Sequence, residues 1–153
     1  MALKICELVS LVLAAWVTGM FVGPWLALTR SIHTFEPEVF LAIVRRLNDN
    51  MASVMTALMP AGLLSIAALL FVSFGARPDI FYPALAALAL FVVALLVTAI
   101  IEVPIVKRIV TWTVPTLPKD WQRLRDRWSA FHIVRIAAAV AGFILLAAGA
   151  IWR

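Results

Sequence analysis

The sequence predicts an all-α integral membrane protein, a four-helix bundle whose second and fourth helices extend beyond the bilayer on one side. First, 65% of the residues are hydrophobic and 14% are charged, with a mean hydropathy of +1.06, whereas soluble domains are about 45–50% apolar and about 25% charged. Second, four uncharged runs make up more than half of the 153 residues. A transmembrane helix needs about 20 apolar residues, so we expect a single transmembrane domain covering residues 1–153.

The uncharged runs define four expected spans, which lie at about residues 8–29, 51–74, 80–101 and 128–152. The last uncharged run, 136–152, has only 17 residues and is short for a span. Reading back to Trp128 adds a stretch in which only His132 and Arg135 are strongly polar. The fourth span therefore begins inside a group of polar residues.

Two proline-containing segments predict that helices two and four begin well outside the bilayer. Glu36-Pro37-Glu38 is typical of a helix start, because proline is tolerated in the first turn and acidic residues are favoured there. Leu117-Pro118-Lys119-Asp120 is a second start of this kind. A helix from near Lys119 to Trp152 would be about 51 Å long, against a hydrocarbon core of ~30 Å. Pro60 should kink the second helix and open space in the bundle.

The basic residues predict the orientation in the membrane. Ten of the 13 Lys and Arg residues fall on the side of the two long connections, and the other three are Lys4, Arg77 and Arg153. The positive-inside rule then places the long connections in the cytoplasm and both termini outside, as in a bacterial-type cytoplasmic (inner) membrane. The basic loops favour contact with anionic membrane lipids. No stacking or basic-groove pattern indicates nucleic acid as a partner.

Small residues on two helices predict close helix packing. Gly19 and Gly23 form a Gly-x-x-x-Gly motif on the first helix, which lets another helix approach closely. Ala138, Gly142 and Gly149 place small residues at spacings of four and seven on the fourth helix. We favour packing within the bundle, with a homo-oligomer formed through these faces as the alternative. Cys6 is the only cysteine, so an intrachain disulfide is excluded.

All four helices place polar residues at the same basic membrane face. They are His33 after the first helix, Asn48, Asp49 and Asn50 before the second span, Glu102 after the third, and His132 with Arg135 in the fourth. One stripe of the fourth helix carries polar or aromatic residues at steps of three, four and three, namely Arg125, Trp128, His132 and Arg135. The sequence thus predicts one polar cluster at one end of the bundle.

This cluster has two interpretations. Ionisable residues at membrane depth cost ~2.5–3.5 kcal/mol and normally face a partner inside the bundle, so Glu102 and Arg135 are expected to pair. The pair either fixes the register of helices three and four or belongs to a functional site. A site should leave a cavity lined by Trp128, His132, Glu102 and Asn50, whereas a structural network should be filled.

A site of this kind would bind a lipophilic molecule that arrives laterally from the membrane. Its substrate-binding residues would be Asn50, Trp128 and Arg125. Its catalytic residues would be Glu102, His132 and Arg135. In one chemistry, His132 acts as a general base near neutral pH and Arg135 stabilises a developing enolate oxygen.

A second chemistry is metal binding. Glu102, His132 and His33 would supply the two-His-one-carboxylate ligand set, and His33 with His132 would be the ligands of a haem. The cofactor is therefore none, a transition metal or a haem. A Gly-rich phosphate loop, a Ser-His-Asp arrangement and a Cys-x-x-Cys pair are all absent from the sequence, so nucleotide hydrolysis and thiol redox chemistry lack support.

Over nearly its whole length, the chain resembles the anthrone-oxygenase-like family of small four-helix membrane proteins. The resemblance rests on Gly19 to Pro24, on Glu102-Val103-Pro104-Ile105 after the third span, and on Trp121 to Arg135 at the fourth. The family pattern reads, loosely, Asn-x-Pro-Leu-Asn and then Arg-Trp-x-x-x-Asn-x-x-Arg. The matching residues are Pro104, Arg127, Trp128 and Arg135.

Three positions depart from the family pattern. Glu102 and Val106 stand where the first two Asn residues are usual, and His132 stands where the Asn of the fourth helix is usual. A carboxylate and an imidazole can bind metals or move protons, whereas an amide does neither. The resemblance implies oxygenation of an anthrone to an anthraquinone, by deprotonation of an activated carbon and reaction of the carbanion with dioxygen.

From these observations we expect an oxygenase-like or oxidoreductase-like membrane protein that acts on, or binds, a lipophilic aromatic or quinone-like molecule. The alternative is a non-enzymatic membrane module, or a metal- or haem-binding protein, whose polar cluster is structural or a ligand set.

Overall fold

The computed structural model describes residues 1–152, and all regular structure within them is helical. The elements are α1 (Ala2–Ala27), η1 (Thr29–Thr34), α2 (Pro37–Ser73), α3 (Pro78–Leu96), η2 (Val97–Glu102), α4 (Val103–Ile109), η3 (Val114–Thr116) and α5 (Trp121–Ile151). Arg153, one of the three basic residues predicted on the outer side, lies outside the described residues.

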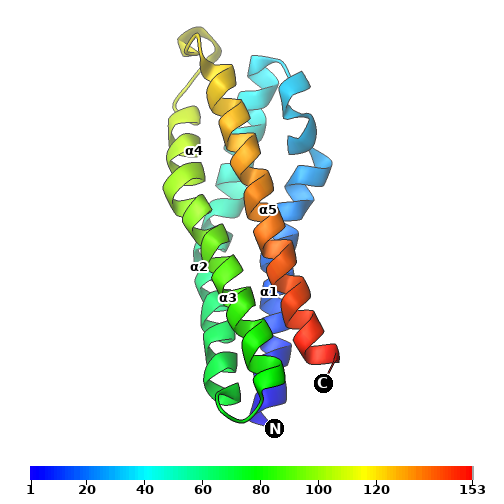
Figure 1. Cartoon of the computed structure of the whole chain (residues 1–153). Helices are drawn as coiled ribbons and strands as arrows, with labels where there is room; N and C mark the ends of the chain where they lie inside the picture. Colours follow the sequence, from blue (N-terminus) through cyan, green and yellow to red (C-terminus); the bar gives the residue numbers. More distant parts are fainter. Residues whose placement is uncertain (153) are drawn as a thin grey trace.

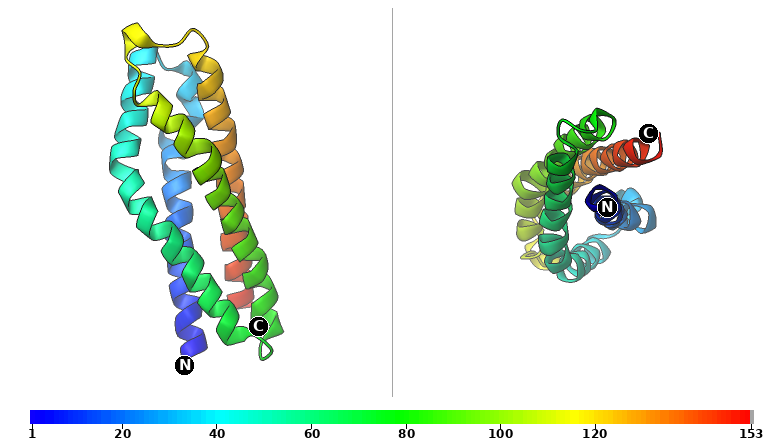
Figure 2. Two further views of the ribbon diagram at one scale, coloured as in Figure 1. Left: turned by 90° about the vertical axis from the view of Figure 1, so that its left-hand side faces the viewer. Right: turned by 90° about the horizontal axis from the view of Figure 1, so that it is seen from below.

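The helices form a bundle of four long columns, because η2 and α4 continue α3 without a break (Figure 1). Each column is long and apolar enough to cross a membrane: Ala2–Thr34, Pro37–Ser73, Pro78–Ile109 and Trp121–Ile151. Both termini lie at the same end of the bundle as the short α2–α3 turn (Figures 1 and 2). The predicted all-α four-helix membrane bundle is therefore confirmed.

The long helices α2 and α5 have 37 and 31 residues, so they are longer than the ~20 residues that a bilayer requires. Pro37 occupies the first turn of α2, as predicted. Pro60 lies inside α2, and this helix changes direction part-way along its length (Figure 2). A proline inside a helix removes one backbone hydrogen bond and bends it.

The third column differs from the prediction, because it does not close at Glu102 but continues to Ile109. The segment Val97–Glu102 is a π-helix, in which the Val103 N–H donates to the Thr98 carbonyl five residues back. Pro104 follows at once. Its ring lacks an N–H and collides with the regular α-helical path of the preceding turn, and a π-turn is one way for the chain to continue as a helix.

The small residues of α5 pack inside the bundle, as expected. A Cβ built on Gly142 would lie 3.0 Å from the Phe91 ring, and one on Gly149 would lie 3.2 Å from Pro83. Gly19 and Gly23 of α1 behave differently, because they are exposed and a Cβ on either would meet nothing within 4 Å. The Gly-x-x-x-Gly motif therefore makes no close contact within the described chain.

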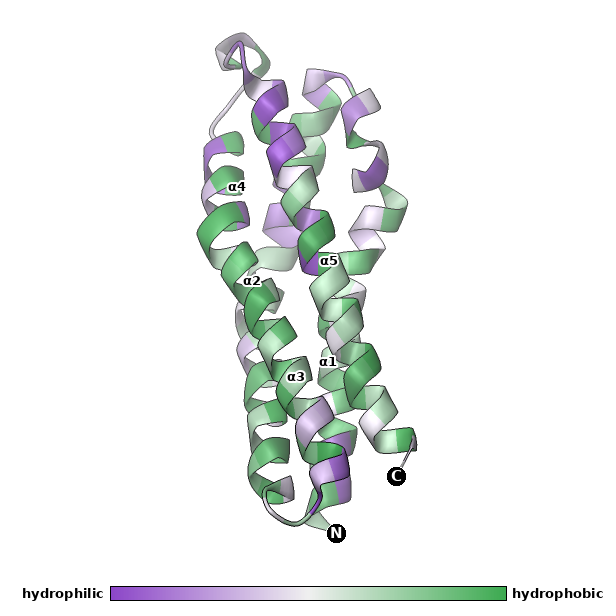
Figure 3. Cartoon of the chain, viewed as in Figure 1, coloured by the Kyte–Doolittle hydropathy of each residue, from purple (hydrophilic) through white to green (hydrophobic). Residues whose placement is uncertain are grey.

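Polar residues gather at the end of the bundle that carries the long connections (Figure 3). A smaller polar group lies at the opposite end, where Arg77 pairs with Asp79 at 2.6 Å and the α1 residue Glu7 is buried. The apolar residues between these ends form the main core, which includes Phe21, Ile66 and Phe91. A second apolar cluster around Phe40, Ile109 and Trp128 closes the bundle near the long connections.

Candidate functional site

A cavity of about 610 Å³ lies in the half of the bundle nearest the long connections, between α1, α2, the η2–α4 segment and α5. One wall is apolar and is made largely by methionines, namely Met51, Met55 and Met59 of α2 and Met20 of α1. The other wall is polar. It carries Glu102 from η2 and His132 and Arg135 from α5.

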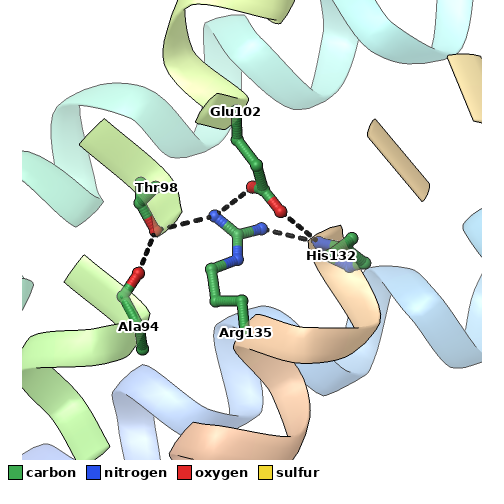
Figure 4. A network of polar contacts seen from close by, with 5 residues as sticks. All are labelled: Ala94, Thr98, Glu102, His132 and Arg135. Atoms are coloured by element: carbon green, nitrogen blue, oxygen red, sulfur yellow. Dashed lines mark hydrogen bonds and ion pairs between the residues drawn. The ribbon is translucent and has the colours of Figure 1, made fainter. Parts of the chain in front are cut away.

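Arg135 is the centre of a polar network (Figure 4). Its Nη1 lies 2.5 Å from Glu102 Oε2 and donates to Thr98 Oγ1 at 3.2 Å. Its Nη2 donates to His132 Nδ1 at 2.7 Å. Its Cζ lies 4.2 Å from the centroid of the Phe21 ring. The guanidinium thus joins α1, η2 and α5 through protein contacts.

The π-helical segment η2 supplies two members of this network. Thr98 is its second residue and Glu102 its last, and the Thr98 hydroxyl also donates to the Ala94 carbonyl at 2.7 Å. On α5, His132 and Arg135 are three residues apart and therefore share a face. The Trp128 ring stacks on the His132 ring, with centroids 5.8 Å apart.

The direction of one hydrogen bond determines the tautomer of His132. A guanidinium only donates, so His132 Nδ1 accepts from Arg135 and the imidazole proton is on Nε2. Nε2 is buried and makes no hydrogen bond within the described residues, and the same is true of Glu102 Oε1. Oε1 lies 3.5 Å from His132 Nδ1. Glu102 and His132, which both belong to the cavity lining, therefore hold one carboxylate oxygen and one N–H donor that have no protein partner.

The structure brings together four of the residues singled out from the sequence. Glu102, His132, Arg135 and Trp128 all line the cavity, and the first two are 3% and 4% exposed. The predicted Glu102–Arg135 pair is present. The cavity lies beside this pair. A cavity is the expectation for a functional site, whereas a structural network should be filled.

Asn50 and Arg125 do not line the cavity. Asn50 is exposed on α2, and Asn48 lines the cavity in its place. The reason is helical geometry, because Asn48 is three residues before Met51 and shares its face, whereas Asn50 is turned away by about 100°. Arg125 is buried outside the cavity lining, where it pairs with Asp126 at 2.8 Å and lies over the Trp121 ring.

The predicted ligand set of Glu102, His132 and His33 is not assembled. His33 lies in η1, is exposed, and does not share the cavity with His132. No three His, Cys, Asp or Glu residues within 1–152 lie close enough to hold a metal ion. The fold separates the two histidines because η1 turns His33 outward while α5 turns His132 inward.

Sequence reasoning missed the methionine wall and Thr98. The spacing of Met51, Met55 and Met59 at four-residue steps is a signal that places them on one helix face. No comparable signal marks Thr98, because its place in the network depends on the π-turn at η2.

These features define a small helical membrane protein with a largely apolar cavity and one buried charged network. The family model described as Anthrone oxygenase matches residues 49–145, a stretch that contains the α2 methionines, η2 and the polar residues of α5. The chain belongs to this family, which confirms the resemblance seen in the sequence. No curated protein and no solved structure matches the chain.

Proposed function

We propose that this protein is a membrane-embedded oxygenase that binds a lipophilic aromatic or quinone-like substrate in the cavity and removes a proton from it. The observation that carries the proposal is that Glu102 and His132, each with an unpartnered buried atom (Oε1 and Nε2), belong to the lining of a cavity of about 610 Å³. Small-molecule sites have volumes of about 300–1,000 Å³ and combine an apolar lining with a few polar groups.

The lining suits a flat aromatic ring. Methionine side chains are flexible and polarizable, and their sulfur atoms make favourable contacts with aromatic rings. Met51, Met55 and Met59 line the same cavity as Glu102 and His132. An aromatic substrate between the two walls would contact thioethers on one side and Glu102 and His132 on the other.

The cavity reaches the outside of the bundle between α2 and the η2–α4 segment. Ala52 and Thr56 of α2 line the cavity and are also exposed, as are Ala99 of η2 and Val103 of α4. These residues are small or medium-sized and lie on the membrane-spanning columns. A lipophilic substrate would enter laterally from the bilayer through this opening.

The hydrogen-bond directions favour a particular division of roles. A proton passes from an activated C–H group of the substrate to Glu102 Oε1, and the electron pair stays on the substrate. The negative charge spreads to a carbonyl oxygen, which accepts a hydrogen bond from His132 Nε2. The sequence-based expectation assigned the base to His132, but its Nδ1 is occupied by Arg135 and its Nε2 carries the proton.

Arg135 is a positioning residue in this scheme, because its Nη1 and Nη2 are engaged by Glu102, Thr98 and His132. The carbanion then reacts with dioxygen, so that an anthrone and dioxygen give an anthraquinone and water.

Turnover of a test anthrone by the protein in lipid nanodiscs tests the proposal, with quinone formation followed by absorbance and dioxygen uptake by an electrode. Met55→Trp should fill the cavity and abolish turnover. Leu64→Trp places the same ring on α2 at an exposed position outside the cavity and should leave turnover unchanged. A rate equal to that of empty nanodiscs, or full activity of Met55→Trp, would contradict the proposal.

A further inference from the structure

The cavity has a second group of polar side chains at its outer end, nearest the long connections. Thr29 at the start of η1, Asn48 of α2 and Lys107 in the last turn of α4 all line it there. The Thr29 hydroxyl is buried, with the residue 1% exposed, and has no hydrogen-bond partner. Within residues 1–152, the side chains of Asn48 and Lys107 also make no hydrogen bond or ion pair.

The cavity lining carries an uncompensated positive charge at this end. Glu102 and Arg135 lie 2.5 Å apart and offset each other, which leaves Lys107 as the unbalanced charge of the lining. An ammonium group, an amide and a hydroxyl all donate hydrogen bonds. A set of donors around one cation complements an anion, because hydrogen bonds to charged groups are the stronger kind.

Lys107, in the outer group, is separated from Glu102 along the helix axis. Lys107 follows Glu102 by five residues of helix, which is about 7.5 Å along the axis at 1.5 Å per residue. The Lys107 backbone is therefore more than one helical turn beyond Glu102, and an anion held by Lys107 would lie on the side of the cavity nearest the long connections. It would lie toward the membrane surface, where the charged end of an amphipathic molecule is most stable.

We propose that Thr29, Asn48 and Lys107 form a subsite for an anionic group, a carboxylate, sulfonate or phosphate, carried at one end of the apolar ligand. The inference rests on the proposed function, because it assigns an end to the ligand of the same cavity. Two classes of ligand carry such an anionic group: aromatic acids, and anionic lipids through their headgroups. In either case the anion fixes the orientation of the ligand, with its apolar body against the methionine wall.

Two dyes that share one aromatic body test the subsite. These are 1-anilinonaphthalene-8-sulfonate, which is an anion, and N-phenyl-1-naphthylamine, which lacks the sulfonate. Both are titrated by fluorescence into the protein in phosphatidylcholine nanodiscs, with empty discs subtracted. The subsite predicts that the protein binds the sulfonate more tightly than the neutral dye.

Variants assign the preference to the subsite. Lys107→Gln should weaken binding of the sulfonate about tenfold and leave the neutral dye unchanged, and Thr29→Val should weaken the sulfonate alone by a smaller factor. The matched control is Arg108→Gln, because Arg108 is the next residue, equally basic and exposed, and does not line the cavity. Its affinity for both dyes should equal that of the wild type.

The outcomes separate the subsite from the cavity. If both dyes bind equally well, or if Lys107→Gln and Arg108→Gln have the same effect, the subsite is wrong and the proposed function stands. If neither dye binds, or if Met55→Trp leaves binding unchanged, the cavity is not a ligand site and both proposals fail. Displacement of the sulfonate by phosphatidylglycerol would support a lipid as the source, and displacement by 2-naphthoate alone would support an aromatic acid.

Discussion

The guanidinium of Arg135 donates to Thr98 and His132 and pairs with Glu102. A buried ion pair of this kind adds little net stability, because the cost of removing the charges from water offsets their attraction. Its effect here is on hydrogen-bond direction. By donating to Nδ1, Arg135 keeps the His132 proton on Nε2, and by pairing with Oε2 it leaves Glu102 Oε1 unpartnered.

Replacing His132 separates the donor role from the base role. An asparagine keeps an N–H donor but accepts no proton at neutral pH, so His132→Asn should retain turnover within about tenfold of the wild type. His132→Leu removes the donor and should lower kcat by about 10²–10³-fold, as loss of an oxyanion donor does. Steady-state kinetics on the test anthrone check this, with helicity and thermal unfolding as folding controls. Equal loss in both variants would instead make His132 the base.

At the scale of elements, the π-turn at η2 places Glu102 in the network. In a regular α-helix Glu102 and the side chains after it would be rotated relative to Thr98, by up to about 100°, because the π-turn holds one additional residue. Pro104 favours the π-turn by lacking the N–H that a regular helix would use. The α3 part of the same column packs against the small residues of α5. α3 therefore contributes to the packing of the bundle, whereas the η2–α4 part contributes residues to the site.

Replacing Pro104 should damage the site more than the fold. Pro104→Ala restores an N–H and permits a regular helix, which would turn Glu102 away from Arg135 and His132. Turnover should fall by about a hundredfold, the size of effect that follows a displacement of about 1 Å in a reacting group, while the unfolding temperature stays unchanged or rises. Pro37→Ala is the control, because Pro37 lies in the first turn of α2. Unchanged turnover in Pro104→Ala would show that η2 does not depend on this proline.

Substituting leucine for glycine should destabilise the protein at one position and leave its stability nearly unchanged at another. A Cβ at Gly142 would lie 3.0 Å from the Phe91 ring, so Gly142→Leu should reduce the free energy of unfolding by about 1–3 kcal/mol, as overpacking does. Gly19 is open to its surroundings, so Gly19→Leu should change it by less than about 0.5 kcal/mol. Thermal unfolding in detergent gives both values. If Gly19→Leu also reduces the size of the protein–detergent particle, the exposed Gly-x-x-x-Gly motif lies in the interface of a homo-oligomer, which was the alternative left open by the sequence.

At the scale of the whole molecule, both termini and the α2–α3 turn share one end, and the long connections share the other (Figure 1). Figure 3 shows that the second end carries most of the hydrophilic residues. The excess of Lys and Arg there predicts a cytoplasmic location in a bacterial-type inner membrane. The cavity would then lie in the cytoplasmic half of the bilayer, with Lys107 near its surface.

Cysteine labelling tests this orientation. In a Cys6→Ser background, Ala76→Cys lies in the exposed α2–α3 turn and Thr113→Cys lies in the exposed α4–α5 connection. In intact bacterial cells, a membrane-impermeant maleimide should label Ala76→Cys and leave Thr113→Cys unlabelled until the cells are opened. The reverse pattern would place the long connections outside.

The composition and the four uncharged runs were sufficient to predict the four-helix membrane bundle, because the bilayer requires about 20 apolar residues per span whatever the neighbouring helices do. The start of α2 followed from local chemistry at Pro37, and α5 begins at Trp121, two residues after the start expected near Lys119. The stripe of Trp128, His132 and Arg135 followed from helical spacing. These features depend on a helix and the bilayer alone, and the sequence by itself determined them.

Other features depended on how the helices meet. The choice of Asn48 over Asn50, the outward position of His33 and the π-turn that carries Thr98 and Glu102 were decided by the tertiary structure. So was the tautomer of His132, since a contact with Arg135 sets it. Spacing within one helix defines a face, but only the packing of four helices determines which face meets a cavity and which meets lipid.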